Sequence, residues 1–227
     1  MRNPGGRPIA LATVTALTLA APWTSTTAAE AGDWVVRGGV THISPDEDTG
    51  DIDGMLAPVL SGSEVDVDSA TALGLTGTYF VTDTVAVELL ASSPFEHDLS
   101  IDGALNDPDL GDTKLLPPTL SAQYHFDTGT SWRPYVGVGV NYTIFFDEDV
   151  DSEAAGAGVT DIDIDNSIGP AAQVGVDYEF GNRWLINADV RYIDIEADTS
   201  VDTGPASTDV DVDVDPWIGT VSVGYRF

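Results

Sequence analysis

The chain has 227 residues, with 38 acidic side chains against 8 basic ones and a formal net charge of −30. This charge argues against nucleic acid as a partner, because phosphate contacts need clustered lysine and arginine side chains. The chain contains no cysteine, which excludes a scaffold held together by disulfides.

The N-terminal segment has the composition of a secretory signal peptide. Arg2 and Arg7 supply a positive start, residues 9–21 are a run of apolar and small residues with threonines, and alanines follow at 28, 29 and 31. The apolar run is too short to span a membrane as a helix. We therefore predict a signal peptide at residues 1–29, cleaved between residues 28 and 31, and one mature domain at residues 30–227.

The mature chain contains eight segments in which apolar side chains occupy every second position, the pattern of β-strands. In chain order they lie at about 33–43, 69–81, 85–93, 117–126, 133–146, 166–180, 184–198 and 210–227. The clearest is RPYVGVGVNYTIFF, where valines at 136, 138 and 140 alternate with glycines at 137 and 139. No stretch after the signal peptide approaches the roughly 18 apolar residues of a transmembrane helix.

The connections between these segments alternate between short and long. Residues 82–84, 127–132 and 181–183 are short turns, whereas 44–68, 94–116, 147–165 and 199–209 are long and carry most of the acids. This layout predicts an all-β fold, an eight-stranded antiparallel transmembrane β-barrel in the bacterial outer membrane, with its short turns in the periplasm. Outer-membrane lipid requires closure, because an open sheet edge would leave backbone groups unpaired in hydrocarbon.

Each predicted strand has an apolar face and an opposite, mostly polar face. If the apolar face contacts lipid, the opposite face points into the barrel. Eight strands leave an interior just wide enough for side chains, and buried charges there need partners. We predict a polar network in the lower lumen, formed by Arg37, Glu88, Gln123, His125, Asp177, Asp189, Arg191 and Arg226.

Toward the long connections, the inward residues change from charged to apolar. Leu90 follows Glu88 on the inward face, and Ile193 and Ile195 follow Arg191. We predict a hydrophobic channel with Leu90 at its constriction, although a space-filling leucine is the alternative at that position. The predicted lining residues are Leu90, Ile193, Ile195, Val210, Val212 and Val214.

Three prolines, Pro94, Pro117 and Pro118, lie at the outer ends of neighbouring strands. Proline cannot donate a hydrogen bond to a strand ladder, so it is tolerated only at edges and strand ends. Two interpretations remain open: a locally unpaired wall that forms a lateral opening, and ordinary strand termination.

Several stretches resemble the small outer-membrane proteins of the OmpW family, which includes alkane-uptake relatives: AGDWVVRGG, VELLASSPF, LLPPTL, NADVRYIDIE and DPWIGTVSVGYRF. The resemblance implies a narrow hydrophobic channel that passes small apolar molecules, with an opening in the barrel wall. Resemblance to outer-membrane barrels in general implies that the terminal strand, with Tyr225 and Phe227, is the assembly signal read by the outer-membrane barrel-assembly machinery. The chain departs from the family in its acidic loops and at Arg191, where the family has a tryptophan.

No catalytic motif, cofactor motif or metal-ligand spacing is present. There is no GxSxG or HExxH sequence, and the aspartate runs DIDID and DVDVDVD lack the pattern of an EF-hand loop. We therefore expect no enzyme activity, no cofactor and no specific metal site, with divalent cations as loosely held partners of the acidic loops. The predicted function is uptake of small hydrophobic solutes; the alternative is a structural or adhesive barrel whose acidic loops bind cations or a partner.

Overall fold

The computed structural model describes residues 29–45, 47–54, 64–102, 109–150, 155, 160–181, 183–202 and 207–227. The predicted signal peptide lies, except for its last residue, outside the described residues. Among the residues described, no helix is both long and apolar enough to cross a membrane.

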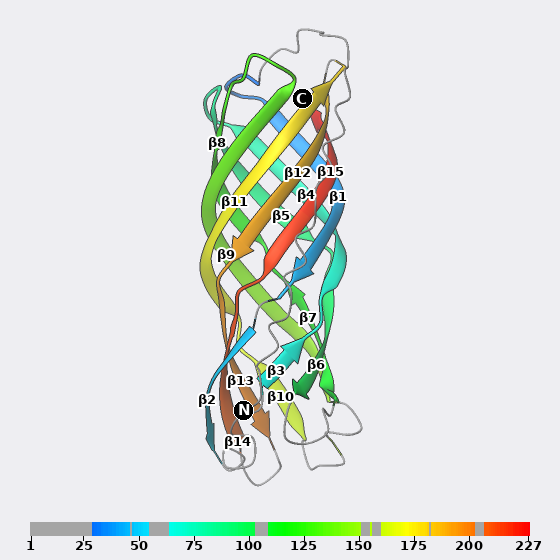
Figure 1. The fold of residues 1–227 in the computed structure, drawn as a ribbon, viewed down its shortest axis with the longest axis vertical. Coiled ribbons are helices and arrows are strands. Elements are labelled where there is room, and N and C mark those ends of the chain that lie inside the picture. Colours follow the sequence, from blue (N-terminus) through cyan, green and yellow to red (C-terminus); the bar gives the residue numbers. More distant parts are fainter. Residues whose placement is uncertain are drawn as a thin grey trace, which may run out of the picture.

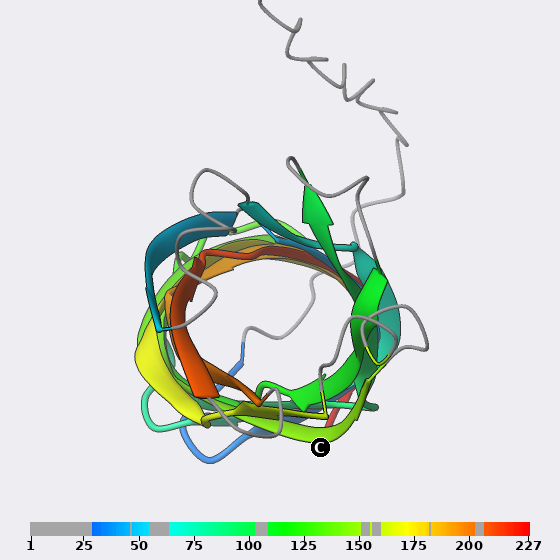
Figure 2. The same cartoon turned by 90° about the horizontal axis from the view of Figure 1, so that it is seen from below.

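Eight antiparallel strands form a closed barrel (Figures 1 and 2). The strands are β1 (Trp34–Ser44), β4 (Ala70–Phe80), β5 (Val85–Ser92), β8 (Thr119–His125), β9 (Trp132–Val150), β11 (Ser167–Phe180), β12 (Trp184–Ile193) and β15 (Trp217–Arg226). Each strand pairs with its neighbour in the chain order, and β1 pairs with β15 from Val35↔Arg226 to Ser44↔Trp217. The predicted fold class is confirmed.

One end of the barrel has short connections, after Phe80, His125 and Phe180, and we call it the turn end; it is uppermost in Figure 1. The opposite end, which we call the extended end, continues beyond the closed barrel. Its strands are β2 (Glu47–Gly54), β3 (Glu64–Val67), β6 (Phe95–Asp102), β7 (Asp109–Leu116), β10 (Asp161–Ile164), β13 (Ile195–Asp202) and β14 (Ser207–Val214).

The segments that we predicted as long loops therefore contain much strand. Acidic residues suggested loops, because aspartate is depleted in strands. However, the alternation of aspartate with valine or isoleucine also has the period of a strand, and in the predicted loop at 94–116 the apolar residues Phe95 and Leu115 are buried. Burial on the inner side and cross-strand pairing outweigh the low strand propensity of aspartate.

The sheet β10–β13–β14–β2 brings acids into register with one another. Asp209 lies opposite Asp53, Asp211 opposite Asp198, and Asp213 opposite both Asp48 and Glu196. Like charges directly opposite in a sheet are destabilising. We therefore expect salt to stabilise this sheet, because ions screen the repulsion between its strands.

The outer surface of the closed barrel has the pattern of a lipid-facing band. Large apolar side chains such as Leu73, Val138 and Val221 are more than half exposed on it. Aromatic residues flank the band: along β15, Trp217 and Tyr225 are eight positions apart, which is about 26 Å along the strand. A strand tilt of about 40° brings the vertical span close to the height of an outer-membrane apolar band.

The last residue, Phe227, adds a hydrogen bond between the last strand and the first strand of the barrel. The Phe227 amide donates to the Trp34 carbonyl at 2.8 Å, and the Phe227 ring lies 5.0 Å from that of Tyr225. Replacing Phe227 with aspartate puts a charge at the aromatic boundary, so we expect a marked fall in folded, heat-modifiable protein in the outer membrane. Phe227→Trp, which keeps an aromatic ring, serves as the control. A normal amount of folded Phe227→Asp protein contradicts this prediction.

Candidate functional site

The barrel lumen has three layers. At the turn end, Ala29, Val35, Phe80, Ala86 and Leu185 form an apolar plug. Charged and amide side chains follow, which we call the polar layer. Toward the extended end, which is lowermost in Figure 1, lies a cluster that we call the upper apolar cluster, where "upper" means nearer the extended end. It consists of Ile43, Ala72, Phe95, Leu115, Ala171, Ile193, Ile195 and Ile218. The order is visible along β12, where Leu185, Asn187, Arg191 and Ile193 are all buried.

Arg37 is the most fully bonded cation of the polar layer. Its Nη2 and Nε donate to the two carboxylate oxygens of Asp177, at 2.8 and 3.2 Å. Its Nη1 donates to Glu88 Oε2 at 3.2 Å and to the Thr78 hydroxyl at 2.6 Å. The Arg37 and Glu88 side chains are each almost completely buried. Bidentate pairing of this kind compensates much of the cost of burying the charges.

A second ion pair crosses the barrel. Arg191 Nη2 donates to Glu88 Oε1 at 2.9 Å and also bonds to Gln173 Oε1. Arg191 is on β12 and Glu88 on β5, and these strands are four places apart in the ring of eight, on opposite walls. The Arg191–Glu88 pair therefore spans the lumen directly beneath the upper apolar cluster.

Small residues make room for these side chains. A Cβ atom on Gly175 would lie 2.4 Å from the Tyr135 ring, and one on Gly137 would lie 2.7 Å from Gln173 Nε2. The Tyr135 ring stacks on His125, and its hydroxyl accepts a hydrogen bond from Asn187 at 3.0 Å. The inward glycines in the alternating segments thus allow the polar layer to fill the lumen.

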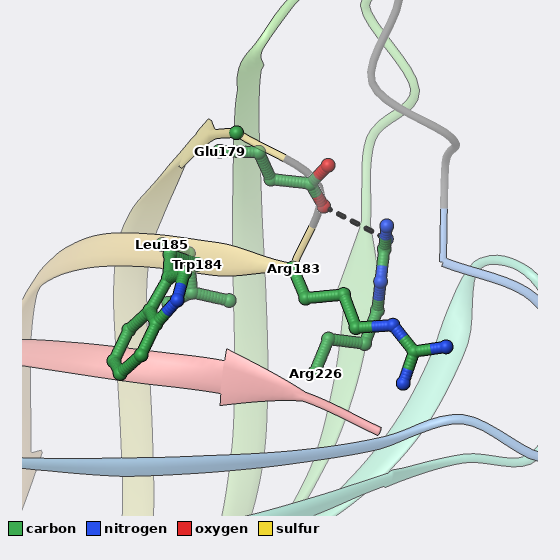
Figure 3. Close-up of a pocket in the computed structure, with 6 residues that line it drawn as sticks. Glu179, Arg183, Trp184, Leu185 and Arg226 are labelled. Atoms are coloured by element: carbon green, nitrogen blue, oxygen red, sulfur yellow. Dashed lines mark hydrogen bonds and ion pairs between the residues drawn. The ribbon is translucent and has the colours of Figure 1, made fainter.

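The remaining predicted network residues lie at different heights. His125 and Gln123 are joined by a 2.9 Å hydrogen bond, and His125 also packs against Phe80 of the plug. Asp189 is on β12 and only half-buried. Arg226 lies at the rim of the turn end, separate from Arg37, where it pairs with Glu179 at 3.1 Å beside a shallow pocket (Figure 3).

The predicted channel-lining residues divide into three groups. Ile193 and Ile195 are members of the upper apolar cluster, and Val214 packs against it. Leu90 is buried but is not part of that cluster. The side chains of Val210 and Val212 lie outside the described residues.

Sequence reasoning did not name Ile43, Phe95, Leu115 or Ile218 as lining residues. The signal for Ile43 and Ile218 was available. Ile43 lies two positions from the inward residue Thr41, and Ile218 lies two positions from the inward residue Thr220, so each pair shares the inner face of its strand. Phe95 and Leu115 fall in a segment that we predicted as a loop. Their inward position depends on the pairing of β6 with β7, where they lie opposite each other.

The three prolines lie beside an interruption in the wall. Pairing of β5 with β8 stops at Leu90↔Thr119, and pairing of β6 with β7 resumes at Phe95↔Leu115. Residues 91–94 on one side and 116–118 on the other lie between these points. Backbone bonding continues on the flanking sides, from Ser93 to Leu73 and from Tyr142 to Pro118. The interruption adjoins the upper apolar cluster, since Phe95 and Leu115 belong to it.

The described residues offer no cluster of three or more histidine, aspartate or glutamate side chains that could hold a metal ion. Lumen carboxylates such as Glu88 and Asp177 are occupied by arginines. The site is therefore a lumen divided by a bridged polar layer, with an apolar surface on one side of that layer.

Residues 30–227 match the model of the OmpW family. This chain belongs to the OmpW family. It is 44% identical over 199 residues to Outer membrane protein W of Salmonella typhimurium, covering 87% of this chain and 90% of that protein. It is 33% identical over 202 residues to Outer membrane protein AlkL of Ectopseudomonas oleovorans, covering 86% and 83%.

The fold agrees with that of a solved outer-membrane protein. The crystal structure of OprG from Pseudomonas aeruginosa superposes with a TM-score of 0.81 at 41% identity, and the match covers 87% of this chain and 97% of that chain. The relatives are outer-membrane barrel proteins, so the predicted family and outer-membrane location are confirmed.

Removing the best-bonded cation tests the polar layer. Arg37→Met leaves Asp177 without its arginine and Glu88 with only Arg191, so we expect the free energy of unfolding to fall by about 3–5 kcal/mol. Lys114→Met is the control, because Lys114 pairs with Glu96 and Asp147 in a half-exposed position, where loss of a pair costs about 1 kcal/mol or less. Urea unfolding in lipid vesicles, followed by tryptophan fluorescence, measures both. Equal losses in the two variants would show that the polar layer has no special role in stability.

Proposed function

We propose that this protein takes up small hydrophobic molecules at the cell surface and releases them sideways into the outer membrane. The observation that carries this proposal is the position of the upper apolar cluster, between the cross-barrel pair Arg191–Glu88 and the extended end. In this proposal the extended end faces the outside of the cell, as long connections do in outer-membrane barrels. The protein acts as a channel and not as an enzyme.

Entry into the upper lumen is favourable for an apolar solute. Transfer out of water contributes roughly 25 cal/mol per Å² of apolar surface. The cluster residues Ile43, Ile193 and Ile218 are almost fully buried within the barrel, where they pack with the other members of the cluster. In this proposal the solute inserts among these side chains and gains apolar contacts that water does not provide.

Axial passage to the periplasm is unfavourable for the same solute. It would have to separate the Arg191–Glu88 pair and then cross the plug around Phe80. Breaking a buried ion pair costs several kcal/mol, and an apolar molecule offers the separated charges no hydrogen bonds in return. The interruption at residues 91–94 and 116–118 is the cheaper exit, because fewer wall hydrogen bonds must break there.

Leu90 is the residue that we expect to control entry to this exit. It is buried, it lies two positions above Glu88, and it is the last residue of β5 that pairs with β8. Leu90→Arg should reduce uptake of a medium-chain alkane into cells or liposomes by at least about tenfold, because a passing alkane would displace the polar partners of the buried cation and offer it no hydrogen bonds. Leu89→Ala is the control, since Leu89 faces lipid and is 54% exposed.

If folded Leu90→Arg protein takes up the alkane as fast as wild type, the proposal that the lumen is a channel for apolar solutes is wrong. The structural or adhesive barrel with cation-binding acidic strands would then be the better interpretation. Heat-modifiability on gels confirms that each variant is folded before uptake is measured.

The side exit has its own test. Pro117→Val combined with Pro118→Val restores two backbone N–H groups. The one at residue 117 points toward the interruption, because the Pro118 carbonyl faces Tyr142 of β9 on the other side, so the ladder between the two hairpins can continue. We expect slower alkane uptake, with the fold retained. Pro134→Val, at the start of β9 near the turn end, is the matched control. Equal uptake by the double variant and the control would argue for axial release.

A further inference from the structure

Arg191 is incompletely bonded for a buried arginine. It is 2% exposed, and its hydrogen bonds to Glu88 and Gln173 both use Nη2. In the described part of the chain, Nε and Nη1 have no hydrogen-bond partner. A buried N–H group without a partner carries a desolvation penalty, which is larger for a charged group.

Arg37 shows that the lumen can satisfy an arginine. All three of its nitrogens donate hydrogen bonds, and it has two carboxylate partners. Arg191 shares one carboxylate with it, because Glu88 gives Oε1 to Arg191 and Oε2 to Arg37. Arg191 therefore keeps N–H donors at Nε and Nη1 that the polar layer does not use.

Arg191 also lies where the polar layer meets the upper apolar cluster. Ile193 is the next inward residue of β12 toward the extended end, and Ile218 of β15 is the register partner of Arg191. Both isoleucines are cluster members with at most 1% exposure. Asp189, the nearest acid on β12, is two positions away on the turn-end side. A donor-only cation thus borders an apolar surface.

We propose that Arg191 binds the carboxylate head group of a single-chain fatty acid, whose hydrocarbon chain lies against the upper apolar cluster. This inference rests on the proposed function and names a solute class for it. A carboxylate matches the guanidinium in charge and hydrogen bonding, since all guanidinium N–H groups are donors and charge-assisted bonds are the strong ones. An alkane supplies no acceptor, and an alkylammonium is repelled.

Head-group recognition predicts a difference between solutes with the same chain. Purified barrel in nanodiscs is titrated with dodecanoate labelled with ¹³C at the carboxyl carbon, and binding is followed by the carboxyl chemical shift. Arg191→Met should weaken dodecanoate binding by ~10-fold or more, as expected for lost charge-assisted hydrogen bonds. Arg191→Lys, which keeps the charge, should retain part of the affinity. Arg183→Met, which removes an exposed arginine at the turn end, should bind like wild type.

Dodecane uptake separates this inference from the proposed function. If Arg191 binds the head group, wild type binds dodecanoate at least about tenfold more tightly than the uncharged dodecanol, and Arg191→Met removes that preference. Equal dodecanoate binding in wild type and Arg191→Met overturns head-group recognition, as does an equal loss for both solutes. If wild type moves no dodecane but binds dodecanoate through Arg191, the proposed uptake of apolar solutes fails and the carboxylate site remains.

Discussion

The satisfaction of backbone hydrogen bonds inside a hydrocarbon layer is the constraint on which this structure depends. No water is available in lipid to replace a missing strand partner, so the sheet must close. Closure places β1 against β15 and brings Phe227 to Trp34. The closed ring of this chain has eight strands, and this number leaves a lumen that side chains can fill. The polar layer is a consequence of that width, because charges in so narrow a space must meet one another.

The barrel interior is divided along its axis into a polar layer and two apolar layers. Arginines and carboxylates are paired across the lumen, so each charge is compensated although water is excluded. Apolar side chains occupy both neighbouring layers, at the plug and at the upper cluster. The cross-barrel pair of Arg191 with Glu88 makes the boundary between the polar layer and the upper cluster abrupt. The packed apolar cluster on the extended-end side therefore ends at a guanidinium.

The wall interruption beside Pro94, Pro117 and Pro118 is compatible with the rule of closure because of its place. It lies where the closed barrel gives way to the hairpin of β6 and β7, and the strands on both flanks keep their backbone bonds there. Few donors are left without partners, since three of the residues are prolines with no N–H. A gap in strand pairing is thus tolerated at the extended end of the closed barrel, although it would be strongly destabilising in the middle of the lipid band.

The strands of the closed barrel, their number and the inward face of each strand could be predicted from the sequence, because alternation with a period of two is a local property. The sequence therefore identified Arg37, Glu88 and Asp177 as lumen residues. The alternation shows which face of its strand a residue lies on. It does not show the position of the residue along the barrel axis or its partner, since tilted strands bring residues together that are distant in the sequence. Only the tertiary structure joined Arg191 to Glu88, 103 positions away, and moved Arg226 to the rim. It also turned acidic segments into strands, because pairing with neighbouring strands and burial of alternate apolar side chains depend on contacts that local composition does not contain.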